Sequence, residues 1–287
     1  MEVRKLIFKS DEVMLHGELI SSGEKMSRPT IIMTHGLSGI ISMDLRFYAE
    51  CFVRKGFTCF MYDHRNWGLS SGWPRCETDP WRQVSDMREA ISFIRGQPEV
   101  LSDKIGLWGT SYSGGHVLTV GALDSRVSCI VSQVPLISGS RTFDKWIPEA
   151  RKKEFLDRIM KDFSSRTEGH IPQTTRAAIE GSETEEWVNR SDTNSQYVNR
   201  ITLRTFDLMR SYEPLQFAER IGPTPVALIV AEADTQTPVL WQLEAFEKIC
   251  GRKKIYSIDC RHYDVYGKHK QEAVEAALDW FSRHLLD

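Results

Sequence analysis

The 287-residue sequence lacks an apolar run long enough to cross a membrane or to form the core of a signal peptide. We therefore expect no membrane partner and a cytoplasmic location. It also lacks an excess of charge of either sign, because 37 Lys and Arg residues against 39 Asp and Glu residues give a net charge of −2. With no basic tract present, nucleic acid is not expected as a partner.

Cysteine is sparse and follows no ligand pattern. The six cysteines include no C-x-x-C pair and no Cys/His spacing typical of metal ligands, so no metal site is expected. Cys59 and Cys129 lie within apolar runs, which predicts buried free thiols. Internal repeats, low-complexity tracts and long linkers are absent as well. The length suits one large α/β domain or two small ones.

One short stretch, residues 104–115 (KIGLWGTSYSGG), carries the strongest functional signal. Its apolar strand ends in a turn rich in glycine and serine, and a helical pattern follows directly. This arrangement is typical of a nucleophile elbow, in which a serine sits on a strained strand-to-helix turn with its hydroxyl exposed. The helix that begins there directs its first N–H groups toward negative charge forming beside the serine. Ser111 is therefore the candidate nucleophile.

The motif departs from the usual G-x-S-x-G pattern, because Ser113 stands where the second glycine is expected. Ser113 itself, with Ser111 before it and Gly115 after it, matches the pattern equally well. An elbow serine normally lies about two or three residues beyond its strand, and this distance favours Ser111.

Strands alternate with helices along most of the chain, which predicts a mostly parallel, doubly wound sheet with helices on both faces. The first two strands form an antiparallel hairpin in this prediction. Strands are predicted at 3–9, 13–20, 30–34, 57–62, 105–108, 127–132, 225–230 and 254–258, and helices at 43–55, 80–95, 238–249 and 268–285.

The alternation stops between residues 140 and 215, where the sequence is highly charged and has helical spacing. This break predicts a helical cap inserted into the α/β core. The expected division is a core of residues 1–138 and 216–287 and a cap of residues 139–215.

A nucleophilic serine needs a base, and the base needs an acid to orient it. In this fold the acid and then the base follow the serine along the chain, each in a loop after a strand. Asp234 follows the strand 225–230 and is the candidate acid, with Glu232 as the alternative and helix capping as its structural role. His262 follows the strand 254–258, in the last loop before the C-terminal helix, and is the candidate base.

Attack on a carbonyl group creates an oxyanion, which two N–H donors must stabilise. We expect one donor to be the backbone of Tyr112, the residue after the nucleophile. The second is expected at Leu37, because His35 and Gly36 form a turn directly after the strand 30–34.

These segments together resemble the α/β-hydrolase superfamily over nearly the whole chain. Residues 63–72 (DHRNWGLSSG) are similar to its D-x-R-G-x-G-x-S-x-G stretch, with Asn66 in place of one glycine, and are expected to shape the floor of the site. The segments DPW from Asp79, WGTSYSGGH around the elbow and VSQVP from Val131 resemble a subgroup of microbial hydrolases. That subgroup includes fungal polyketide thiohydrolases and polyketide transferases.

The resemblance implies the α/β-hydrolase fold and a covalent acyl-Ser111 intermediate, with no metal or organic cofactor. His262 would take the serine proton and later activate water or an alcohol, and Asp234 would hold the His262 tautomer. The ring of Tyr112 is a candidate for the pocket wall. The expected reaction is hydrolysis of an ester or thioester, with acyl transfer as the alternative and a non-catalytic binder of the same fold as a third possibility.

The expected substrate is a small molecule with an apolar acyl group, with a carrier-bound acyl chain as a variant. The cap contains aromatic side chains that either wall a pocket or pack within the cap. If two or more face the site, the acyl group is of medium length or bulky. These aromatic residues are Trp146, Phe155, Phe163, Trp187, Tyr197 and Phe206.

Overall fold

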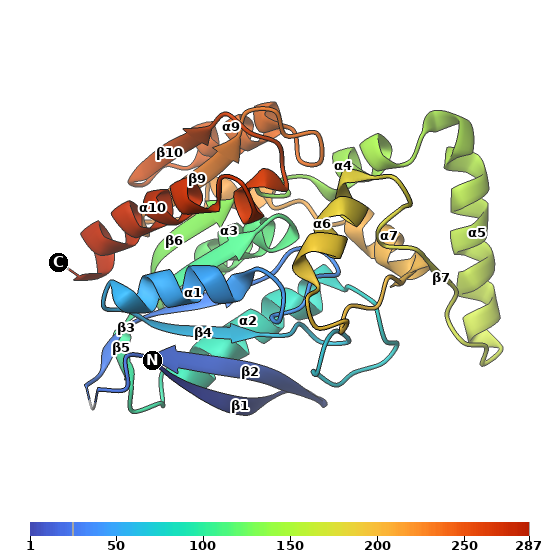
Figure 1. Ribbon diagram of the computed structural model, residues 1–287. Helices are drawn as coiled ribbons and strands as arrows, with labels where there is room; N and C mark the ends of the chain where they lie inside the picture. Colours follow the sequence, from blue (N-terminus) through green and yellow to red (C-terminus); the bar gives the residue numbers. More distant parts are fainter. Residues whose placement is uncertain (25, 287) are drawn as a thin grey trace.

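A computed structural model describes residues 1–24 and 26–286, and its centre is an eight-stranded sheet (Figure 1). The strands lie in the order β1-β2-β4-β3-β5-β6-β9-β10. They are β1 (Glu2–Ser10), β2 (Val13–Ser21), β3 (Arg28–Thr34), β4 (Thr58–Tyr62), β5 (Val100–Thr110), β6 (Val127–Gln133), β9 (Val226–Ala231) and β10 (Lys253–Ile258).

The predicted mostly parallel sheet is confirmed. β1 and β2 form an antiparallel hairpin, β2 pairs with β4 antiparallel, and all remaining neighbours in this sheet pair parallel. Parallel strands covered on both faces are continuously apolar. β9, with the sequence VALIVA, is buried at every one of its residues.

Helices cover both faces of the sheet and form two hydrophobic cores with it. In β3 the side chains of Ile31 and Met33 belong to one core and Ile32 to the other, as the alternation of a strand requires. One face carries α1 (Leu45–Arg54) and α10 (Lys270–Phe281), and the other carries α2 (Pro80–Ile94), α3 (Tyr112–Leu123), α8 (Leu215–Ala218) and α9 (Val239–Lys248).

Between β6 and β9 the chain leaves the sheet and forms a group of helices at one end of it, with α5 extending furthest away (Figure 1). The predicted division into a core and a cap at residues 139–215 stays a prediction. The elements of this segment are α4 (Gly139–Trp146), α5 (Glu149–Thr167), β7 (Thr174–Thr175), α6 (Glu183–Ser191), β8 (Ile201–Thr202) and α7 (Leu203–Arg210).

The observed elements follow the predicted ones, with two differences in length. β5 begins at Val100 rather than at residue 105. The first half of this strand is polar and pairs with β3 through an irregular register, so the apolar pattern in the sequence did not predict it. The predicted helix 268–285 ends as α10 at Phe281, and a 3-10 turn (Asp264–Tyr266) and a π-helical turn (Ser282–Leu286) flank it. Within the described residues, no helix has the length and apolarity needed to span a bilayer.

Candidate active site

Ser111 lies between the end of β5 and the start of α3, with φ of 55° and ψ of −116°. A non-glycine residue adopts this conformation only at a cost, so the surrounding chain must hold it. Its N–H donates to Gln133 O and its carbonyl oxygen accepts from Leu136 N, each at 2.8 Å. Gly109 is required at the turn, because a Cβ there would lie 2.2 Å from Ser113 O. The predicted strained elbow is present at Ser111.

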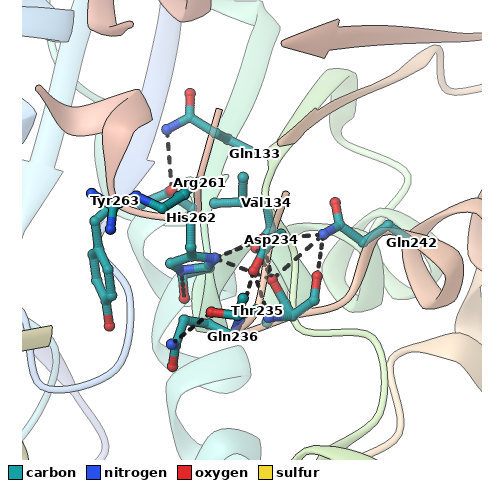
Figure 2. Close-up of polar contacts among 12 residues, drawn as sticks. Gln133, Val134, Asp234, Thr235, Gln236, Gln242, Arg261, His262 and Tyr263 are labelled. Atoms are coloured by element: carbon teal, nitrogen blue, oxygen red, sulfur yellow. Dashed lines mark hydrogen bonds and ion pairs between the residues drawn. The ribbon is translucent and has the colours of Figure 1, made fainter. Parts of the chain in front are cut away.

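The structure brings together the side chains of the predicted nucleophile, base and acid. His262 Nε2 lies 3.1 Å from Ser111 Oγ, and His262 Nδ1 lies 2.7 Å from Asp234 Oδ2. Figure 2 shows the carboxylate of Asp234 beside the His262 ring. His262 and Asp234 are both buried, so solvent does not compete for the bond between them. With Nδ1 bonded to the carboxylate, Nε2 is the nitrogen that faces the serine.

The turn before α9 supplies several further donors to Asp234, which the sequence alone did not reveal. Asp234 Oδ1 accepts from the N–H groups of Gln236 and Thr237 at 2.8 Å, and Oδ2 accepts from Thr237 Oγ1 at 2.9 Å. Gln242 Nε2 approaches Oδ2 at 3.4 Å (Figure 2). Asp234 therefore also organises the turn that precedes the helix, but it does not cap α9, whose N-cap is Pro238 without a side-chain cap bond.

The pKa of Asp234 reflects these contacts. Burial by itself raises the pKa of a carboxyl group, but the neighbouring His262 and the donors of Thr237 outweigh burial. The pKa of Asp234 lies below its ordinary value as a result, which keeps the carboxylate charged beside the imidazole.

The two alternative residues lie elsewhere. Glu232 is exposed and accepts a hydrogen bond from Ser257 Oγ at 2.6 Å. Ser113 is fully buried, and its hydroxyl lies 2.9 Å from His64 Nε2. Neither of them contacts His262 in the part of the chain that the structure describes.

The loop after β3 passes directly beside the elbow. A Cβ on Gly36 would lie 2.9 Å from the Ser111 Cβ, so only glycine permits this close approach. The next residue, Leu37, lines the cavity in front of Ser111, and its N–H donates to no acceptor within the described residues. Tyr112 is the first residue of α3, and its N–H precedes the helical hydrogen bonds. The role of these two N–H groups in binding an oxyanion stays a prediction.

The ring of Tyr112 does not line the cavity, contrary to expectation. It is buried against His116 and Tyr212, with ring centroids 5.2 and 6.0 Å away. The reason is that residues 112–121 of α3 are buried all round, so the first side chain of the helix packs inside the protein.

The segment 63–72 supports the site from below rather than forming the cavity floor, since none of these ten described residues lines the cavity. Asp63 accepts from the N–H groups of Ile41 and Leu69, each at 2.9 Å, and so fixes the loop that carries Leu37. Asn66 has φ of 72°, a left-handed conformation that asparagine tolerates and that glycine adopts freely. This conformation explains why glycine stands there in the superfamily pattern.

Three buried histidines, His35, His64 and His116, lie in a row, with neighbouring ring centroids 4.6 and 5.8 Å apart, and His64 contacts Ser113 of the elbow. Burial lowers the pKa of each ring, to about 3 for His116. His116 Nε2 donates to Gln83 Oε1 at 2.9 Å, and His116 Nδ1 accepts from Tyr212 OH at 2.8 Å. All three rings are therefore neutral at neutral pH.

A cavity of about 290 Å³ opens in front of Ser111 and His262, between the sheet and the helices that follow β6. Of the six predicted cap aromatics, Phe163 is 53% exposed and Tyr197 instead bonds to Ser38 at 3.0 Å. The other four line the cavity, and these are Trp146, Phe155, Trp187 and Phe206.

Helix α6 contacts the loops that surround the cavity. Glu183 pairs with Arg261 at 3.1 Å, next to His262. Thr184 Oγ1 lies 2.7 Å from Tyr263 OH, and Trp187 stacks on the Tyr263 ring with centroids 5.3 Å apart. One helix thus joins the cavity wall to the loop that carries His262.

All six cysteines are free thiols, and Cys59 and Cys129 are buried as predicted. Within the described residues, no group of three or more His, Cys, Asp or Glu side chains could hold a metal ion.

Comparison with known proteins gives one family and several relatives. A family model described as the alpha/beta hydrolase fold matches residues 29–268. The acyltransferase drtE of Aspergillus calidoustus is 30% identical over 275 residues, which cover 91% of this chain and 87% of the relative. The thiohydrolase aneE of Aspergillus aculeatus is 30% identical over 294 residues, which cover 96% of this chain and 91% of the relative.

A solved structure has the same fold over its full length. The alpha/beta hydrolase GrgF from Penicillium sp. sh18 is 26% identical, with a TM-score of 0.88 and coverage of 100% of both chains. The similarity of sequence and of fold thus extends to the helices between β6 and β9.

Proposed function

Because the chain belongs to the alpha/beta hydrolase fold family, we propose that it is a serine hydrolase that cleaves an ester or thioester of an apolar acyl group. The observation that carries the proposal is the series of contacts from Asp234 through His262 to Ser111, which ends at the cavity. We also propose a cytoplasmic location, which the six free cysteines favour.

In the proposed mechanism, Ser111 Oγ attacks the substrate carbonyl carbon while His262 Nε2 takes the hydroxyl proton. The N–H groups of Leu37 and Tyr112 stabilise the oxyanion. His262 then passes the proton to the leaving alcohol or thiol, and the acyl group stays on Ser111. Water adds to the acyl-enzyme with His262 as the base, and the free acid and the original serine are released. Asp234 keeps the imidazole in the required tautomer throughout.

The cavity supports an apolar acyl group of medium size. Its four aromatic lining residues provide a hydrophobic wall, and its volume of about 290 Å³ is near the lower end of the range for small-molecule sites. The thiohydrolase aneE is a relative at 30% identity, which favours a thioester as the scissile bond.

Acyl transfer to an alcohol is a second candidate, favoured by the acyltransferase drtE among the relatives. Both reactions use the same acyl-Ser111 intermediate and differ only in whether water or an alcohol resolves it. Adding a primary alcohol to the assay and measuring the ratio of new ester to free acid distinguishes the two reactions.

The proposal is tested with p-nitrophenyl esters and N-acetylcysteamine thioesters of acetyl to decanoyl groups. We expect Ser111→Ala to lose at least about a thousandfold in kcat, because no other group replaces the nucleophile. Intact mass should show a covalent adduct with a fluorophosphonate in the parent protein and none in Ser111→Ala.

Ser113→Ala is the matched control, because Ser113 is the other serine that satisfies the elbow pattern and its hydroxyl faces His64. It should keep the adduct and most of the turnover. Loss of the adduct in Ser113→Ala, with the adduct retained in Ser111→Ala, would contradict the assignment of the nucleophile.

A further inference from the structure

Asp44 is the carboxylate among the residues that line the cavity, and it has an unusual environment. It occupies the N-cap position of α1, where an aspartate normally accepts from an N–H group of the first turn. The Asp44 side chain makes no such bond. Its donors come from α6 instead, with Trp187 Nε1 at 2.6 Å and Ser191 Oγ at 2.8 Å.

Both of these donors bind the same oxygen atom, Asp44 Oδ2. No donor to Oδ1 is found in the part of the chain that the structure describes, although Asp44 lines the cavity. Oδ1 is accessible to solvent, since it is not among the fully buried side-chain oxygens that lack a partner. A bound molecule that displaces this solvent without replacing its hydrogen bond would leave a charged acceptor unpaired at a largely apolar wall, which is costly. A donor group on the bound molecule would supply that hydrogen bond.

We propose that Asp44 is a specificity-determining residue, which selects acyl chains that carry a hydroxyl group by accepting the hydroxyl hydrogen bond at Oδ1. This inference rests on the proposed function, since it takes the acyl group of the substrate to be the occupant of the cavity. The cap helix α6 holds the carboxylate in place through Oδ2 and leaves Oδ1 for the substrate.

The charges around Asp44 favour a neutral hydroxyl over a cationic ammonium group as the donor. Arg190 and Lys270 both act on the carboxylate through their positive charge, which opposes the rise in its pKa that burial causes. Arg176 also lines the cavity, but Glu185 pairs with it at 3.0 Å, which leaves Arg190 and Lys270 as the cations that act on the carboxylate. An ammonium group beside Asp44 would be repelled by Arg190 and Lys270, whereas a neutral hydroxyl group would not.

The test measures binding rather than turnover, in the Ser111→Ala protein, so that the thioesters stay intact. The ligands are N-acetylcysteamine thioesters of octanoic acid and of its 3-, 6- and 8-hydroxy derivatives, with the matching oxo and ammonium chains. We expect at least one hydroxy chain to bind about tenfold tighter than octanoyl by calorimetry, as a hydrogen bond to a charged group provides.

Asp44→Asn is the informative substitution, combined with Ser111→Ala. Its single amide oxygen can accept the bonds from Trp187 and Ser191, which places an NH₂ donor where Oδ1 was. The hydroxy chain should lose its tenfold advantage, and the matching oxo chain, which can only accept, should bind tighter than in the parent. Glu183→Gln is the control for cap docking, because it weakens the pairing of α6 with Arg261 without touching Asp44, and it should change the affinity for octanoyl and hydroxyoctanoyl by the same factor.

The proposal is overturned if no hydroxy chain binds more tightly than octanoyl, or if the advantage survives Asp44→Asn. Tighter binding of an ammonium chain would overturn the assignment of a hydroxyl. Turnover of the octanoyl thioester by the protein with Ser111 intact reports on the proposed function separately. A hydroxyl preference without any turnover would reject hydrolysis and retain the ligand selection by Asp44.

Discussion

At the scale of single residues, Thr237 is the contact that most directly stabilises the acid of the proposed site. Its backbone N–H and its hydroxyl bind different oxygens of Asp234, at 2.8 and 2.9 Å, and the hydroxyl also lies 3.3 Å from His262 Nδ1. The carboxylate therefore has a fixed orientation before any substrate binds, which a base-orienting acid requires.

Thr237→Val removes the hydroxyl but keeps the shape of the side chain. We expect kcat/KM for an ester to fall about tenfold, since one hydrogen bond to a charged group is lost beside the base. Thr237→Ser retains the hydroxyl and should stay within about threefold of the parent. Equal losses in the two variants would show that packing of the methyl group, rather than the hydroxyl, matters at this position.

The three residues that the structure brings together could be selected from the sequence because their positions depend on local signals. Ser111 stands at a strand-to-helix turn, and Asp234 and His262 each follow a strand in the expected chain order. The partners of these residues depend instead on contacts between distant segments. Nothing in the local sequence of Asp44 predicts that it binds Trp187, which lies 143 positions away.

At the scale of elements, most strands and helices could be predicted because their local signals agree with their burial. Asp79 before Pro80 predicts the start of α2, and the structure has the Asp79 carboxylate accepting from Trp81 N and Arg82 N. The aromatic residues of the cap could not be sorted in this way. Phe163 and Phe155 lie on the same helix, α5, yet one is exposed and the other lines the cavity.

The N-cap residue of α2, Asp79, leads to a prediction about the stability of the protein. Asp79→Ala removes the acceptor for the two N–H groups and should lower the free energy of unfolding by about 1 kcal/mol in urea. Asp79→Asn keeps an acceptor and should lose only a few tenths of that value. A loss as large in Asp79→Asn as in Asp79→Ala would assign the effect to the charge instead of the cap.

At the scale of the whole molecule, the three buried histidines make stability depend on pH. In the folded state the pKa of His116 is about 3, because burial disfavours its charged form, whereas an unfolded histidine titrates near about 6.5. Between these values the unfolded chain binds a proton that the folded chain does not, so stability is full above about pH 6.5 and falls as the pH falls. The lowered pKa values of His35 and His64 act in the same direction.

Urea unfolding measured from pH 7 to pH 5 checks this expectation. The contribution of His116 alone should be about 2 kcal/mol between pH 6.5 and 5, and His116→Gln should reduce the pH dependence by that amount. The exposed His170 is the matched control, and His170→Gln should leave the dependence unchanged. An undiminished pH dependence in His116→Gln would contradict the assignment.

The contacts of α6 have a consequence for building chimaeras of this protein. A chimaera that replaces residues 139–215 with the lid of another hydrolase would leave Asp44, Arg261 and Tyr263 facing a foreign surface, since α6 supplies partners to all three. Arg261 and Tyr263 lie directly before and directly after His262 in the sequence, so the loss of their partners would disturb the proposed base. The unit to transfer is therefore residues 139–215 together with these three positions. We expect a graft that includes all of them to keep the contacts around His262.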